Sequence, residues 1–195
     1  MRAYLASVSI FVAIAAAFAL EIALGAVAND DALIALGALP DTDKLGGDYW
    51  RWMSFGFLHW DLTHLLLNSA LLLAAGPIAE RRAGLSWVLI VFFAASISSG
   101  VGISIKHFVW PSQGASVGAS GGMFGLLGYA LVLMYRFPPD RPIIRKALAA
   151  VAIVGFAYSL APGISMVGHL IGFSVGVLTA FFFPRSDRGM LASVA

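Results

Sequence analysis

A serine and a histidine stand out in the long apolar stretches of this 195-residue chain. Ser120 lies in the glycine-rich sequence Gly-Ala-Ser-Gly-Gly, and His169 lies between Gly168 and Gly172. A serine hydroxyl is a weak nucleophile unless a base within roughly 2.6–3.2 Å takes its proton, and an imidazole is suited to that task. The two residues therefore predict a Ser-His dyad, provided that the fold brings them together.

A second polar pair, His64 and Asn68, lies in another apolar stretch. Residues four apart share one face of a helix and are separated by about 6 Å along its axis, so both side chains can point into one cavity. Two interpretations remain open for such residues. They can line a site, or they can be hydrogen-bonding partners that hold helices together in lipid. Ser120 has a similar alternative, a hydroxyl bonded to its own helix backbone.

No carboxylate accompanies Ser120 or His169 in its apolar stretch, so the third member of a catalytic triad is missing. Phe124, one turn after Ser120, is placed to orient the imidazole by stacking. Glu21 is expected to be a structural partner of the first outer loop. His59 and His107 are expected at the membrane interface, without a role.

Several other kinds of site are disfavoured. The chain has no cysteine, which excludes disulfides and thiolate sites. Its four histidines are dispersed without a carboxylate cluster, so we expect no metal and no cofactor. The net charge is only +2 and the basic residues are scattered, which argues against nucleic-acid binding. The glycine-serine sequence also matches the nucleophile elbow of soluble hydrolases, but that motif needs a preceding strand and a large sheet.

The composition identifies the environment, because 60% of the residues are hydrophobic and only 11% are charged. Soluble domains are about 45–50% apolar and about 25% charged. Apolar runs bounded by charges, glycine or proline predict six membrane spans. The predicted fold is therefore one all-α polytopic membrane domain over residues 1–195, with spans at about 3–28, 59–76, 85–105, 117–135, 143–160 and 164–183.

Basic residues predict the orientation of the spans. If the N-terminus is cytoplasmic, only Lys44, Arg51 and Lys106 of the twelve Lys and Arg residues lie outside, which is a strong positive-inside bias. Both termini are then cytoplasmic. Spans two, four and six all run from outside to inside, so their polar residues lie at similar depth. Glycines spaced four apart would let these helices approach closely, namely the pairs Gly118/Gly122, Gly121/Gly125 and Gly172/Gly176.

Together these residues resemble the rhomboid intramembrane serine proteases. The resemblance covers roughly residues 45–180 and rests on four motifs, Trp50-Arg51, His64-x-x-x-Asn68, Gly118-Ala119-Ser120-Gly121 and His169-x-x-Gly172-x-x-x-Gly176. The sequence from Gly76-Pro77 to Gly84 also resembles the turn that follows the second span in this family. Two positions differ from some members, Phe124 in place of tyrosine and Val117 in place of glycine.

The resemblance implies a minimal six-helix rhomboid in a bacterial inner membrane. It implies that Ser120 is the nucleophile and His169 its base, with an oxyanion hole formed by His64, Asn68 and the Ser120 backbone N–H. The expected reaction is hydrolysis of membrane-anchored proteins near the outer face, with the lipid bilayer and transmembrane substrates as partners. One alternative is a rhomboid-like protein that binds membrane clients without cleaving them. Another is a small transporter, although the inner halves of the three polar spans offer almost no polar path.

Overall fold

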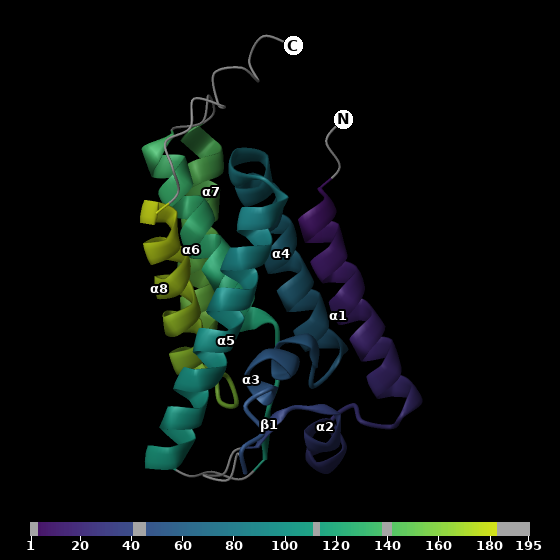
Figure 1. Cartoon of the computed structure of the whole chain (residues 1–195). Helices are drawn as coiled ribbons and strands as arrows, with labels where there is room; N and C mark the ends of the chain where they lie inside the picture. Colours follow the sequence, from purple (N-terminus) through teal and green to yellow (C-terminus); the bar gives the residue numbers. More distant parts are fainter. Residues whose placement is uncertain (1–3, 41–45, 111–113, 138–141, 183–195) are drawn as a thin grey trace.

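The computed structural model describes residues 4–40, 46–110, 114–137 and 142–182. Six long helices form one bundle and correspond to the six predicted apolar runs (Figure 1). Their bounds are α1 Leu5–Ala23, α4 Leu62–Ala83, α5 Leu85–Val109, α6 Ser120–Arg136, α7 Pro142–Tyr158 and α8 Met166–Phe182. Helix α1 begins, and α8 finishes, at the same end of the bundle, which we call the terminal end.

Helix α6 is the centre of the bundle, because it packs against α4, α5, α7 and α8. All ten residues from 121 to 130 are buried, including Met123, Leu127 and Tyr129. A helix that is apolar on all sides is expected where other helices surround it. The site described below lies at the first residue of this helix.

Helix length and composition fit a membrane protein. Three helices, α1, α4 and α5, are long and apolar enough to cross a bilayer. The other three, α6, α7 and α8, have 17 residues each, at the lower end of the roughly 17–25 residues that span the hydrocarbon core. The protein is therefore an all-α polytopic membrane bundle.

The turn predicted from Gly76-Pro77 to Gly84 is confined to the end of that range, because α4 continues through Pro77 to Ala83. Gly76 is explained instead by helix packing, since a Cβ there would lie 2.8 Å from Ser7 Oγ of α1. A proline within a membrane helix is tolerated when neighbouring helices support the backbone. The chain turns at Gly84, whose φ of 88° suits glycine.

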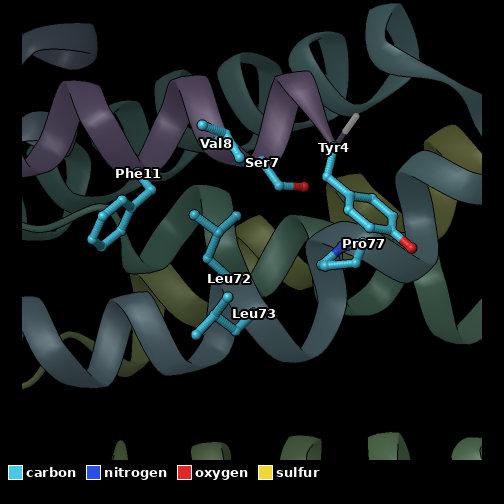
Figure 2. Close-up of a pocket in the computed structure, with 7 residues that line it drawn as sticks. All are labelled: Tyr4, Ser7, Val8, Phe11, Leu72, Leu73 and Pro77. Carbon is cyan, nitrogen blue, oxygen red and sulfur yellow. The ribbon is translucent and has the colours of Figure 1, made fainter. Parts of the chain in front are cut away.

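Helices α1 and α4 are joined near the terminal end by the buried carboxylate of Glu80. It accepts hydrogen bonds from the backbone N–H groups of Ala6 and Ser7 and from the Ser7 hydroxyl, at 2.8, 3.0 and 2.8 Å. The carboxylate thus satisfies N–H groups in the first turn of α1, which have no partner within their own helix. Beside this contact lies an apolar pocket between α1 and α4, lined by residues that include Phe11, Leu72 and Pro77 (Figure 2).

The opposite end of the bundle, which we call the loop end, carries the connection between α1 and α4. This connection contains α2 Asp30–Leu36, β1 Leu39–Pro40, α3 Arg51–Ser54 and the 3-10 turn η1 Phe55–Phe57 (Figure 1). Strand β1 pairs antiparallel with β2, Ala115–Ser116, in the segment that leads to α6. The backbone N–H of Ala115 also donates to the Asp30 carboxylate at 2.9 Å. These contacts attach the connection between α1 and α4 to the segment that precedes Ser120.

Candidate active site

The structure brings Ser120 and His169 into direct contact. The Ser120 hydroxyl oxygen lies 2.8 Å from Nε2 of His169, although the two residues are 49 positions apart. Ser120 is the first residue of α6, and His169 lies in the first turn of α8. Both helices begin on the loop-end side of the bundle, so their polar first turns meet there (Figure 1).

An irregular segment delivers Ser120 to this position. Gly118 is buried, has a φ of 129° that suits glycine, and donates its N–H to the carbonyl of Phe55 at 3.0 Å. The chain therefore enters the bundle in an extended form and becomes helical only at Ser120. The first N–H groups of a helix have no acceptor within it, so the Ser120 N–H is placed to bind a ligand oxygen.

Two pairs of glycines allow α6 and α8 to cross at backbone distance. A Cβ on Gly172 would overlap the carbonyl oxygen of Gly121, and a Cβ on Gly176 would overlap that of Gly125. Close approach of this kind brings a short serine side chain within reach of an imidazole on the neighbouring helix. Two of the three predicted glycine pairs, Gly121/Gly125 and Gly172/Gly176, thus pack against each other.

The third predicted pair, Gly118/Gly122, does not form a helix-packing face. Gly118 precedes the helix, and a Cβ there would lie 2.6 Å from Cε1 of His64. Gly122 faces α5 instead, where a Cβ would lie 2.5 Å from the ring of Phe92. The two glycines contact different neighbours, because Gly118 precedes α6 and does not share a helix face with Gly122.

Ser99 of α5 supports both halves of the dyad and was not identified from the sequence. Its buried hydroxyl donates to the carbonyl of Gly168, the residue before His169, at 2.8 Å. A Cβ on Gly121, the residue after Ser120, would lie 2.5 Å from the same hydroxyl oxygen. One side chain therefore fixes the first turn of α8 against α5 while limiting the size of the residue after Ser120. Serines in apolar helices are common, so no sequence signal distinguishes this one.

Phe124 stacks on the imidazole of His169. The ring centroids are 4.2 Å apart and the planes differ by 10°. Phe156 of α7 packs against Phe124 in a tilted arrangement, with the ring centroids 5.0 Å apart. The imidazole is thus buried, at 6% exposure, and its plane is set by an aromatic face. The sequence spacing predicted this position of Phe124.

His64 and Asn68 lie on α4 and reach the same region. The His64 ring is next to Gly118, where a Cβ would lie 2.7 Å from His64 Nε2 and 3.7 Å from Ser120 Oγ. Asn68 is 4% exposed, and its side-chain nitrogen has no hydrogen-bond partner among the described residues. An amide that only joined helices would have such a partner, because an unsatisfied buried donor is costly. This orphan donor favours a role toward a bound ligand.

His59 and His107, which were expected at the membrane interface, are both buried inside the protein, at 0% and 1% exposure. The backbone N–H of His59 donates to both carboxylate oxygens of Glu21, at 3.1 and 3.2 Å, which confirms that Glu21 is a structural partner of the outer loop. The His59 ring packs edge-on against His64, with centroids 5.1 Å apart. Glu21 and His59 therefore support the position of His64.

Trp50 and Arg51 organise the loop between α1 and α4. The guanidinium of Arg51 donates to the carbonyls of Ile34 and Ala38 at 2.5 and 3.0 Å, and its Nε pairs with Asp48 at 3.1 Å. It also lies 4.7 Å from the centre of the Trp50 ring. These contacts fix the backbone around β1, which in turn pairs with the segment before Ser120.

The second ring nitrogen of His169 is also in contact with a serine. Its Nδ1 lies 2.6 Å from the hydroxyl oxygen of Ser159, which follows the last residue of α7. Ser159 is 2% exposed and also donates to the carbonyl of Gly155 at 2.7 Å. Ser159 was not identified from the sequence. The third member of a catalytic triad is expected to be a carboxylate, and Ser159 is not one.

Within the described residues, no group of three or more His, Asp or Glu side chains is placed to hold a metal ion. The polar groups that the structure brings together at Ser120 are hydroxyls, imidazoles, an amide and backbone N–H groups.

Comparison with known proteins identifies the family. A sequence model of the Rhomboid domain matches residues 46–186, which is more than half of the chain and includes the whole site. The chain belongs to the rhomboid family. This confirms the resemblance carried by the four sequence motifs.

Individual relatives agree with this assignment. The chain is 28% identical over 166 residues to proteins named rhomboid protease GlpG from Yersinia pseudotuberculosis and Yersinia pestis, an alignment that covers 83% of this chain and 58% of each relative. It is 31% identical over 139 residues to RHOMBOID-like protein 4 of Arabidopsis thaliana, covering 70% of this chain and 34% of that protein. The chain thus spans little more than half the length of the bacterial relatives. As a rhomboid it is an integral membrane protein.

Proposed function

We propose that this rhomboid is a serine endopeptidase that cleaves membrane-anchored proteins within the bilayer. The observation that carries the proposal is the 2.8 Å contact between Ser120 Oγ and His169 Nε2. This distance is the one required for an imidazole to take a proton from a hydroxyl nucleophile. The names of the bacterial relatives, which are called proteases, support the same activity.

The proposed reaction has two stages. Ser120 Oγ attacks the carbonyl carbon of the scissile peptide while His169 Nε2 accepts the hydroxyl proton. The tetrahedral intermediate collapses when His169 gives this proton to the leaving amine, which breaks the C–N bond and leaves an acyl-serine. Water then attacks the ester with His169 as base, and the proton returns to Ser120 as the carboxylic acid leaves.

Charge on the intermediate requires hydrogen-bond donors beside Ser120. The N–H of Ser120 at the start of α6, the imidazole of His64 next to Gly118 and the orphan amide of Asn68 form the proposed oxyanion hole. Such donors stabilise the transition state because they are already in position when the negative charge develops. Phe124 supports His169, and Gly118, Gly121 and Gly172 provide the space for this arrangement.

The substrates we propose are transmembrane helices that unwind near the loop end of the bundle. A hydrogen-bonded helix does not expose its carbonyl carbons, so the scissile bond must leave the helical conformation first. The distribution of basic residues puts the loop end outside and both termini in the cytoplasm. By analogy with the minimal six-helix form that the chain resembles, we assign the protein to a bacterial inner membrane.

A rhomboid that binds membrane clients without cleaving them is the competing function. It would need neither the Ser-His contact nor an orphan amide.

Purified protein in detergent should cleave a model transmembrane substrate and react with a fluorophosphonate at Ser120. Ser120→Ala and His169→Ala should abolish cleavage while the protein remains folded. The matched control is Ser104→Ala, which removes a serine hydroxyl from α5 instead. Cleavage by Ser120→Ala at the native rate would contradict the proposal.

A further inference from the structure

Ser159 is unexplained by the reaction above, although it touches the proposed base. Its hydroxyl oxygen is 2.6 Å from His169 Nδ1, on the side of the ring opposite Ser120. The residue is 2% exposed and lies where α7 ends and the connection to α8 begins.

The direction of the hydrogen bonds follows from counting protons. A serine hydroxyl has one proton, and Ser159 Oγ lies 2.7 Å from the carbonyl oxygen of Gly155, which can only accept. If the proton is donated to Gly155, the hydroxyl oxygen accepts from His169 Nδ1–H. If the Ser159 hydroxyl donated to His169 Nδ1 instead, its oxygen and the carbonyl oxygen of Gly155 would be in contact without a proton between them. The network therefore favours the tautomer in which Nδ1 carries the proton.

We propose that Ser159 is a positioning residue that holds His169 in the Nδ1–H tautomer. The proposal rests on the proposed function, because its consequence is that Nε2 has a free lone pair directed at the Ser120 hydroxyl. In the other tautomer Nε2 would carry the proton and could not take one from Ser120. Ser159 thus has the orienting task that a carboxylate performs in a Ser-His-Asp triad.

A hydroxyl suits this task inside a membrane protein. A buried carboxylate without a charged partner is costly in a medium of low dielectric constant, whereas the Ser159 hydroxyl is neutral and both of its hydrogen bonds are made. Stacking on Phe124 fixes the plane of the imidazole, but a rotation of 180° about the Cβ–Cγ bond keeps that plane while exchanging Nδ1 with Cδ2 and Nε2 with Cε1. The bond from Nδ1 to Ser159 selects one of these two orientations, so the two contacts constrain different properties of the ring.

Nuclear magnetic resonance tests the tautomer without reference to activity. The protein is labelled with 15N in its histidine rings, and the His169 signals are assigned by their loss in His169→Gln. At a pH where the ring is neutral, we expect a protonated Nδ1 and an unprotonated Nε2. Ser159→Ala should give a mixture of both tautomers. A protonated Nε2 in the native protein, or an unchanged tautomer in Ser159→Ala, would overturn the proposal.

Kinetics test the consequence with variants matched in shape. Ser159→Ala should lower kcat by about 10- to 100-fold with KM unchanged, because a misplaced base slows the chemical step and not substrate binding. Ser159→Thr keeps the hydroxyl. Ser159→Val introduces a side chain with the shape of threonine but without the hydroxyl. We expect Thr to retain most of the rate and Val to behave like Ala. Equal rates for Thr and Val would overturn the proposal, even if Ala folds poorly.

Ser104 provides the control for general effects of losing a hydroxyl. Like Ser159 it donates to the carbonyl four residues earlier, at 2.9 Å, and accepts from a ring N–H, that of Trp52, at 3.1 Å. Ser104→Ala should leave kcat unchanged, and an equal loss there would make the effect of Ser159 merely structural. Failure of the protease proposal is recognised separately, as cleavage that does not depend on Ser120. In that case the resonance experiment alone decides whether Ser159 sets the tautomer.

Discussion

The ring of Phe124 lies almost parallel to the imidazole of His169, 4.2 Å from it. Phe124 is four residues after Ser120 on α6, so the helix that carries the nucleophile also holds the base in place. Any shift of α6 moves the Ser120 and Phe124 contacts of His169 together. The relative position of Ser120 and His169 therefore depends on the α6–α8 pair, whose backbones are in contact at the glycine crossing, together with the support that Ser99 and Ser159 give to His169 and its neighbour.

Loss of this stack should slow catalysis. Aromatic pairs contribute about 0.5–1.5 kcal/mol beyond their buried area, so Phe124→Leu is expected to lower kcat by about two- to tenfold. The control is Phe156→Leu, which removes a ring that touches Phe124 and Phe173 but is not stacked on His169. Comparing kcat and melting temperature for the two variants separates orientation from packing. Equal kcat values in both variants would argue against an orienting role.

Asn68 should matter for rate more than for stability. Removal of one oxyanion donor typically costs about 10²–10³ in kcat, and Asn68→Ala is expected to show a loss of this size with little change in KM. Because its amide nitrogen has no partner among the described residues, the variant should not melt at a lower temperature. His64→Ala tests the second donor in the same way. Normal kcat with a lowered melting temperature would assign either residue to helix packing.

The glycine crossing predicts a steep sensitivity to one methyl group. Gly172→Ala would place a Cβ on the carbonyl oxygen of Gly121, so α6 and α8 must separate. Overpacking of this kind costs about 1–3 kcal/mol, and separation also lengthens the Ser120–His169 contact. We expect a lower melting temperature and loss of cleavage. Gly56→Ala is the control, since its Cβ would meet only ordinary contacts at 3.6 Å.

Glu80 should stabilise the bundle without affecting the reaction. Glu80→Ala leaves two backbone N–H groups and the Ser7 hydroxyl without their acceptor, and hydrogen bonds to charged groups contribute about 1.5–3 kcal/mol. We expect a clear decrease in unfolding free energy but unchanged kcat in the folded fraction. Ser7→Ala removes one of the three bonds and should cost less. A variant as stable as the native protein would show that α1 docks by apolar packing alone.

Orientation in the membrane can be tested with single cysteines, because the native chain has none. Asp31→Cys lies at the loop end, and Ser86→Cys lies in the first turn of α5 at the terminal end, both at exposed positions. An impermeant thiol reagent added to intact cells should label the Asp31→Cys variant and not the Ser86→Cys variant. Labelling of Ser86→Cys should require permeabilised cells. The reverse pattern would contradict the positive-inside prediction and the proposed outer site.

The sequence by itself determined the membrane class and the six helices, and it predicted that Ser120 and His169 would form a dyad if the fold brought them together. These features follow from contact with lipid. Only apolar side chains are favourable on the surface that faces lipid, so polar side chains must face the bundle interior. Glycine spacing indicated which faces could approach, and helical periodicity placed Phe124 over the imidazole. Each of these is a local pattern with a fixed geometric meaning.

Only the tertiary structure decided what lies around the dyad. Ser99 and Ser159 resemble any serine in an apolar helix, and their partners at Gly168 and His169 depend on how α5, α7 and α8 are aligned along their axes. Likewise, the extension of α4 beyond Pro77 depends on support from α1, which the local sequence does not encode. Hydrogen bonds between residues distant in the chain are determined by the register of whole helices, and that register depends on the packing of all their contacts together.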